Sequence, residues 1–139
     1  MAEDDDGQAM LVQRNLARAG ITNGLFRVKD GQELLDCLSH NACEDRMLSD
    51  SVVILLDINM PRMDGVETLR RIKSDDVTRS IPVIMLTTTD DPREIDHCYQ
   101  LGCNVYLTKP VEYDAFIEAI QRLGLFLQIV KRPRLHARR

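Results

Sequence analysis

One short apolar run constrains the fold of this chain more than any other feature. Residues Val52 to Leu56 are all aliphatic, and most of them are β-branched. A similar run follows at Pro82–Leu86, and shorter strand-like segments lie at Leu25–Val28 and Asn104–Leu107. Uninterrupted apolar runs are typical of parallel strands that are buried on both faces. The sequence therefore predicts a parallel sheet built from these runs.

Helical patterns separate the predicted strands. The expected helices span Gln8–Ala19, Gln32–Leu38, Val66–Lys73, Arg93–Leu101 and Tyr113 to about Val130. Asp30, Asp64 and Asp91 each stand three residues before a glutamate, which is the spacing of an N-cap and its capping box. We interpret these aspartates as caps rather than catalytic acids. Alternating strands and helices imply right-handed crossovers and a sheet that is covered on both faces.

The charge is unevenly distributed along the chain. The 139 residues fit one domain and carry a net charge of −4. The last nine residues hold five basic side chains and no acidic one, which leaves 13 basic and 22 acidic residues in the first 130. An acidic body argues against general binding of nucleic acid. We predict one domain over residues 1–130 and a basic tail over residues 131–139.

No stretch of the sequence predicts a membrane segment or a signal peptide. The longest apolar run has five residues, far fewer than a membrane-spanning helix needs. Acidic residues follow Met1 closely, where a signal peptide would carry basic and then apolar residues. We therefore expect a cytoplasmic protein without membrane contact.

Reactive side chains follow the predicted strands at their carboxyl ends. Asp57 follows the first long run, Thr87 the second and Lys109 the third, and Glu3 and Asp4 precede the first helix. Parallel sheets place their sites beyond these strand ends. An aspartate can attack phosphorus to form an acyl phosphate, and Mg²⁺ prefers oxygen ligands. Lysine and threonine can bind phosphoryl oxygens, so the set suits phosphoryl transfer.

These residues, in this order, resemble the motifs of response-regulator receiver domains. The matching segments are Asp57–Gly65, Glu3–Asp5, Thr87 and Lys109–Pro110. The resemblance covers about Glu3 to Val130 and implies a flavodoxin-like (βα)5 fold, a doubly wound parallel sheet of strand order 2-1-3-4-5. The segment Cys98–Asn104 and the apolar end of the last helix are similar to single-domain regulators of phytochrome-type histidine kinases.

The resemblance implies a role for each matched residue. Asp57 would be the phosphoacceptor, and Thr87 and Lys109 would contact the phosphoryl group. Thr87 and Tyr106 would form the conformational switch, and the Lys109–Pro110 bond would be cis. Mg²⁺ would be bound by Glu3 (through water), Asp4, Asp57 and the backbone carbonyl of Asn59.

Two functions remain open within this family. The first is a two-component response regulator that a partner histidine kinase phosphorylates on Asp57 and that signals through protein contact. The second is an interaction module that works without phosphorylation. Neither is an enzyme beyond its own phosphorylation and dephosphorylation. A phosphatase is disfavoured because Asn59 stands where a second aspartate is expected, and no glycine-rich loop indicates a nucleotide site.

The apolar end of the last predicted helix indicates a homodimer. Its aliphatic and aromatic residues exceed what one core-facing stripe requires. They are Leu123, Leu125, Phe126, Leu127, Ile129 and Val130.

The family's first strand is almost absent from this sequence. Only Met1 and Ala2 precede Glu3, where receiver domains carry a central apolar strand. The strand is missing or truncated, or another segment fills the gap, or the N-terminal region is built differently; we favour truncation. We expect Glu3 and Asp4 to lie on an unsupported chain end, which would weaken Mg²⁺ binding and impair phosphorylation relative to a version with the strand restored.

Overall fold

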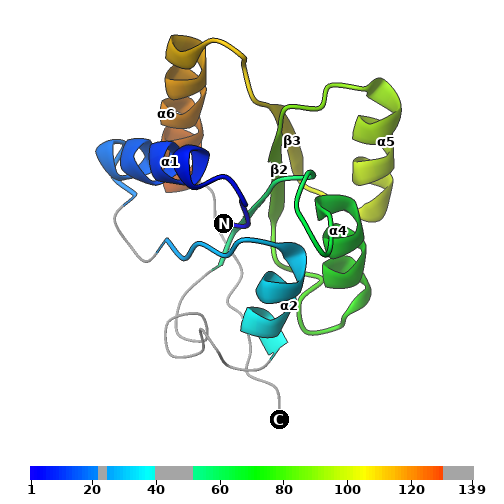
Figure 1. The fold of residues 1–139 in the computed structure, drawn as a ribbon. Coiled ribbons are helices and arrows are strands. Elements are labelled where there is room, and N and C mark those ends of the chain that lie inside the picture. The colour runs from blue at the N-terminus through cyan, green and yellow to red at the C-terminus, as the bar shows by residue number, and fades with distance from the viewer. Residues whose placement is uncertain (22–24, 40–51, 130–139) are drawn as a thin grey trace.

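A parallel sheet forms the centre of the molecule (Figure 1). The computed structural model describes residues 1–21, 25–39 and 52–129. In order across the sheet, the strands are β1 (Ile54–Leu56), β2 (Val83–Thr87) and β3 (Val105–Thr108). Every residue of β1 and β2 is buried, as the uninterrupted apolar runs predict. The Thr87–Thr108 pair brings the carboxyl ends of β2 and β3 to the same edge.

The N-terminal residues occupy the place of the first strand. Ala2 forms parallel bridges to Val28 on one side and to Leu56 on the other. The order across the sheet is therefore residues 25–28, residues 1–3, β1, β2 and β3, which is the 2-1-3-4-5 order of a flavodoxin-like receiver fold. The first strand is reduced to this bridge, as predicted.

The prediction of an unsupported Glu3 is wrong. The Glu3 N–H donates to the Val28 carbonyl at 3.0 Å, and the Ala2 N–H donates to the Leu55 carbonyl at 2.9 Å. Three residues are enough for this because Ala2 bonds to β1 on one side while Glu3 bonds to Val28 on the other. Asp4, one residue further along the chain, is exposed.

Helices cover both faces of the sheet (Figure 1). They are α1 (Asp6–Arg18), α2 (Gly31–Ser39), α4 (Gly65–Ser74), α5 (Pro92–Leu101) and α6 (Tyr113–Ile129). α1 packs on α6 over one face, and α2, α4 and α5 form a row over the other. Two hydrophobic cores result, because successive strand residues point to opposite faces: Leu55 and Ile84 belong to one core, and Leu56 and Met85 to the other.

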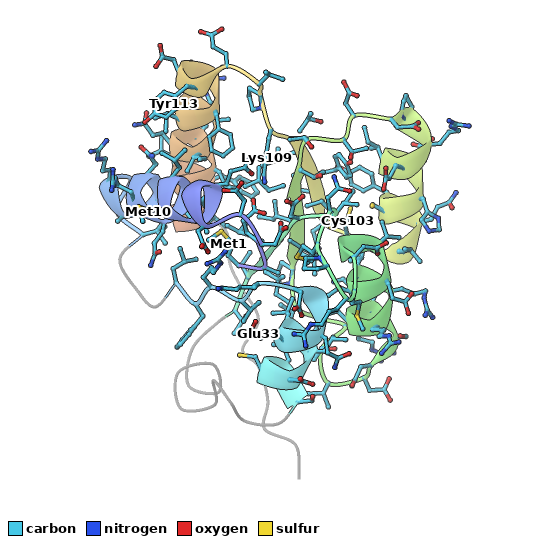
Figure 2. All side chains as sticks on the ribbon, in the orientation of Figure 1. Met1, Met10, Glu33, Cys103, Lys109 and Tyr113 are labelled. Atoms are coloured by element: carbon cyan, nitrogen blue, oxygen red, sulfur yellow. The ribbon has the colours of Figure 1, made fainter. Side chains whose placement is uncertain are left out.

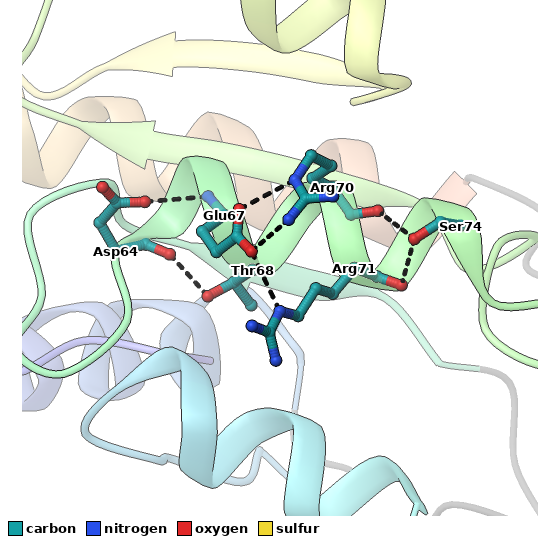
Figure 3. A network of polar contacts seen from close by, with 6 residues as sticks. All are labelled: Asp64, Glu67, Thr68, Arg70, Arg71 and Ser74. Atoms are coloured by element: carbon teal, nitrogen blue, oxygen red, sulfur yellow. Dashed lines mark hydrogen bonds and ion pairs between the residues drawn. The ribbon is translucent and has the colours of Figure 1, made fainter.

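The three predicted aspartate caps all accept a hydrogen bond from the first turn of their helix. Asp30 and Asp64 accept from the N–H groups of Glu33 and Glu67, each at 2.9 Å, whereas Asp91 accepts from Arg93. The capping box at α4 is incomplete (Figure 3). Glu67 pairs with Arg70 and Arg71 on the helix surface and does not reach back to the cap.

The apolar residues of α6 divide into two groups. Leu123 and Leu127 are buried in the core with α1, whereas Leu125 and Phe126 are 59% and 42% exposed. Val130 and the predicted tail over residues 131–139 lie outside the described residues, as do the side chains of residues 128 and 129. Within the described part of the chain, no helix is both long and apolar enough to cross a membrane.

The Lys109–Pro110 peptide bond is trans, since the described residues contain no cis peptide bond. The resemblance had implied a cis bond, and this prediction is wrong. The physical preference agrees with the observed isomer, because the trans form of a bond before proline is favoured by about 0.5–1 kcal/mol.

Candidate functional site

The loop after β1 fixes the position of Asp57. The Asp57 N–H donates to the Ala2 carbonyl at 3.2 Å, and its side-chain Oδ1 accepts from the Ile58 N–H at 2.7 Å. The Gly65 N–H closes the loop on the Ile58 carbonyl at 2.8 Å. A Cβ atom on Gly65 would lie 2.0 Å from the Asp57 carbonyl oxygen, so only glycine allows this close approach. The other carboxylate oxygen of Asp57 remains directed at the site.

Lys109 brings the carboxylates together. The backbone N–H of Lys109 donates to the Thr87 carbonyl at 2.6 Å. This bond holds Lys109, which follows β3, beside the end of β2. Its side chain is buried and forms an ion pair with Glu3, while Nζ lies 3.3 Å from Asp57 Oδ2 and 2.6 Å from Gln8 Oε1. Figure 2 shows Lys109 between α1 and the strands.

The cluster carries more negative than positive charge in a buried setting. Burial and the neighbouring Asp57 carboxylate raise the pKa of Glu3 to about 7, although Lys109 acts in the opposite direction. Glu3 Oε2 is buried and has no hydrogen-bond partner. An unsatisfied buried carboxylate oxygen is costly, so this atom favours a ligand that carries positive charge.

The carboxylates fit a divalent cation. Glu3, Asp4 and Asp57 each offer an oxygen atom, and these atoms lie within 4.8 Å of one another. A donor set made only of oxygens suits a hard cation such as Mg²⁺, which keeps several waters. The exposure of Asp4 leaves one side of the set open to water. Asn59 is also exposed, two residues beyond Asp57.

The two predicted switch residues are linked through the loop after β2. Thr87 is buried, and its hydroxyl lies 3.5 Å from the Thr89 N–H. The Tyr106 hydroxyl donates to the Thr89 carbonyl at 2.7 Å, and burial raises the pKa of Tyr106 to about 12. The Tyr106 hydroxyl group therefore stays protonated and keeps donating at neutral pH.

Sequence reasoning missed Gln8 and the cap that precedes it. Asp5 is the N-cap of α1, and its Oδ1 accepts from the Gln8 N–H at 2.9 Å. The signal was present, because Asp5 and Gln8 have the same spacing as the three caps that were predicted. That spacing predicts a helix start, but it cannot predict that the Gln8 side chain binds Lys109, which is 101 residues away.

Comparison with known proteins relates the chain to one family. The model of the response regulator receiver domain matches residues 1–121. Response regulator Rcp1 of Synechocystis is 31% identical over 134 residues, which are 96% of this chain and 90% of Rcp1. The Mn²⁺-bound crystal structure of Rcp1 superposes with a TM-score of 0.82 and covers 95% of each chain.

Two further solved structures are similar over nearly the whole chain. A response regulator receiver domain from Rhodospirillum rubrum is 42% identical, with a TM-score of 0.88, and the match covers 99% of this chain and 97% of that one. The phosphorylated cyanobacterial phytochrome response regulator RcpA is 32% identical, with a TM-score of 0.83 and coverage of 95% and 94%.

Proposed function

The chain belongs to the response regulator receiver family, and we propose that a partner histidine kinase phosphorylates it on Asp57. One observation carries the proposal: Asp57 Oδ2 faces the buried Lys109 ammonium group while Oδ1 is held by the Ile58 N–H. Oδ2 is therefore the nucleophile, fixed by its backbone and faced by a positive charge.

The proposed reaction moves a phosphoryl group from a phosphohistidine of the kinase to Asp57. Asp57 Oδ2 forms a bond to phosphorus while the phosphorus–nitrogen bond of the donor's phosphohistidine breaks, and the leaving imidazole nitrogen takes up a proton from water. Lys109 contacts one phosphoryl oxygen and the Thr87 hydroxyl donates to another. The product is an acyl phosphate on Asp57.

Bound Mg²⁺ would offset negative charge on the phosphoryl oxygens. The residues that would hold it are Asp4, Asp57 and the backbone carbonyl of Asn59, with Glu3 acting through water. The orphaned Glu3 Oε2 and the clustering of the three carboxylates support this ligand set.

Signalling follows from the loop that joins the switch residues. When Thr87 moves to the phosphoryl group, the Thr89 carbonyl that receives the Tyr106 hydroxyl moves with it. Tyr106 then changes position, and the surface of α5, β3 and α6 changes its affinity for a partner protein. A phytochrome-type histidine kinase is the proposed donor, supported by the similarity to RcpA.

We also propose the domain bounds, the cellular location and the oligomeric state of the protein. The receiver domain extends over residues 1–130, and residues 131–139 form a basic tail. The protein acts in the cytoplasm without binding nucleic acid or membrane, and it forms a homodimer through the α6 region. The exposed Leu125 and Phe126 support the last point.

Phosphorylation by a small phosphodonor tests the proposal. With acetyl phosphate and Mg²⁺, intact-protein mass spectrometry should find one added phosphoryl group on the wild type and on Asp36→Ala, an exposed acid of α2. Asp57→Ala should remain unlabelled because it lacks the carboxylate. Equal labelling of Asp57→Ala would contradict the assignment, and a partner that binds the wild type and Asp57→Ala equally with or without phosphodonor would favour the phosphorylation-independent module.

A further inference from the structure

Gln8 is the uncharged side chain that contacts the buried ammonium group of Lys109. Its Oε1 lies 2.6 Å from Nζ, whereas Asp57 Oδ2 lies 3.3 Å away. A hydrogen bond from a cation to an amide oxygen is charge-assisted and stronger than one between neutral groups. Gln8 therefore helps to fix where the Lys109 ammonium group lies.

Gln8 is held at its backbone as well as at its side chain. It is the third residue of α1, and its N–H donates to the Oδ1 of the N-cap Asp5 at 2.9 Å. The residue is half-buried. The contact therefore connects the capped first turn of α1 to Lys109.

The other two acceptors of Lys109 change during the proposed reaction, whereas Gln8 does not. Asp57 gives a carboxylate oxygen to phosphorus, and Glu3 would share its negative charge with bound Mg²⁺. Gln8 is a neutral amide outside the cluster of three carboxylates. It therefore accepts from Lys109 both before and after the phosphoryl group arrives.

We propose that Gln8 is a positioning residue that holds the Lys109 ammonium group on the α1 side of the site and directs its remaining hydrogens at the phosphoryl group. The inference rests on the proposed function of Asp57. A neutral acceptor suits this task, because it anchors the ammonium group without forming a competing ion pair. Methionine matches the length of glutamine but provides only a weak acceptor.

The test compares Gln8→Met with Gln13→Met, which changes an exposed glutamine of the same helix. With saturating acetyl phosphate and Mg²⁺, we expect the labelling rate constant of Gln8→Met to fall about tenfold, the effect of losing one charge-assisted hydrogen bond. The Mg²⁺ affinity should stay at its wild-type value, because Gln8 is not a metal ligand, whereas the thermal unfolding midpoint should fall, because the buried Lys109 ammonium group loses an acceptor. Gln13→Met should behave as the wild type in all three measurements.

Nuclear magnetic resonance of the ¹⁵N-labelled Lys109 ammonium group supplies a readout that does not depend on activity. In the wild type and in Gln13→Met, its hydrogens should exchange slowly with water, with and without beryllium fluoride as a phosphoryl analogue. Exchange should be faster in Gln8→Met and remain slow in Gln8→Glu, which keeps an acceptor of the same reach.

The outcomes separate the two proposals. If the wild type is labelled and Gln8→Met reacts equally fast, or if the Lys109 signal is equally protected in both, the role of Gln8 is refuted. If the wild type takes up no phosphoryl group, the proposed function fails, and the exchange measurement on the free protein still decides whether Gln8 holds Lys109.

Discussion

At the scale of single residues, Asp30 is a buried acid that lies outside the site. It joins the start of α2 to the loop that carries Arg62. Its Oδ1 caps α2 through the Glu33 N–H, and its Oδ2 accepts from Arg62 Nε at 2.8 Å. Arg62 has a backbone φ of 62°, a region that costs a non-glycine residue about 1–2 kcal/mol. The ion pair with Asp30 helps to offset that strain, so Asp30 stabilises the loop between Asp57 and α4.

The stability contributed by Asp30 should depend on pH. Burial acts to raise its pKa, but the hydrogen bond from Glu33 and the contact with Arg62 outweigh burial and hold the pKa below the ordinary 3.8. A lowered pKa means that the contribution is present above 3.8 and is lost as the pH falls through the folded-state value. Asp30→Asn keeps the cap but removes the charge. We expect it to reduce the free energy of unfolding by about 1–2 kcal/mol at neutral pH.

Urea unfolding at neutral pH and near pH 3 measures this effect. The difference between Asp30→Asn and the wild type should be smaller at the lower pH, because the stabilising charge is lost as the pH falls from 3.8 toward the lowered folded-state pKa of Asp30. Asp36→Asn, on the exposed side of the same helix, should show little difference at either pH. A constant difference for Asp30→Asn would mean that the charge of Asp30 is not the cause.

At the scale of elements, the packing of α1 on α6 decides how α6 sits on the sheet. The buried residues Phe116, Ile120, Leu123 and Leu127 form one stripe that faces α1 and the strands. Gly124 lies beside this stripe, and a Cβ atom there would stand 2.5 Å from the Ala19 Cβ. The glycine therefore allows the close approach of the two helices.

Replacing Gly124 by alanine should destabilise the protein although alanine favours helix. The propensity gain is about 1 kcal/mol, whereas a clash in a packed interface costs about 1–3 kcal/mol. We expect a net loss of up to about 2 kcal/mol, which urea unfolding can measure. Adding Ala19→Gly should recover part of the loss, because it removes the atom that the new methyl group meets. A double mutant that shows no recovery would place the strain elsewhere.

At the scale of the whole molecule, the described surface leaves apolar residues of α6 in contact with solvent. Leu125 and Phe126 point away from the buried stripe of the same helix and are 59% and 42% exposed. The apolar residues of α6 that are not needed for its core-facing stripe therefore lie on the surface, near the C-terminal end of the helix. A homodimer would cover it.

Leu125→Glu should weaken self-association without unfolding the chain. Because Leu125 is exposed, the change leaves the core intact, but it places a charge in the proposed interface. We expect the dimer dissociation constant to rise at least about tenfold, measured by sedimentation over a range of concentrations. Met10→Glu, at an exposed apolar residue of α1, is the matched control. A monomeric wild type, or equal association of the two variants, would contradict the proposed interface.

The sequence by itself determined the sheet, the helices and the edge at which Asp57, Thr87 and Lys109 lie. Apolar runs identify buried strands locally, aspartate caps mark helix starts locally, and parallel strands must end at a common edge. These regularities depend on residues that are near one another in the chain. They also explain why the predicted helices and the three later strands differ from the observed ones only at the ends, whereas the predicted strand over residues 25–28 is reduced to a bridge at Val28.

Only the tertiary structure decided how the site is completed. Ala2 enters the sheet between Val28 and Leu56 and fixes Glu3 there, although the sequence shows almost no first strand. Gln8 reaches Lys109 across 101 residues. The physical reason is the same in both cases: backbone groups and side chains that are buried together must satisfy one another's hydrogen bonds, and which groups meet is set by the packing of distant segments, which no local pattern records.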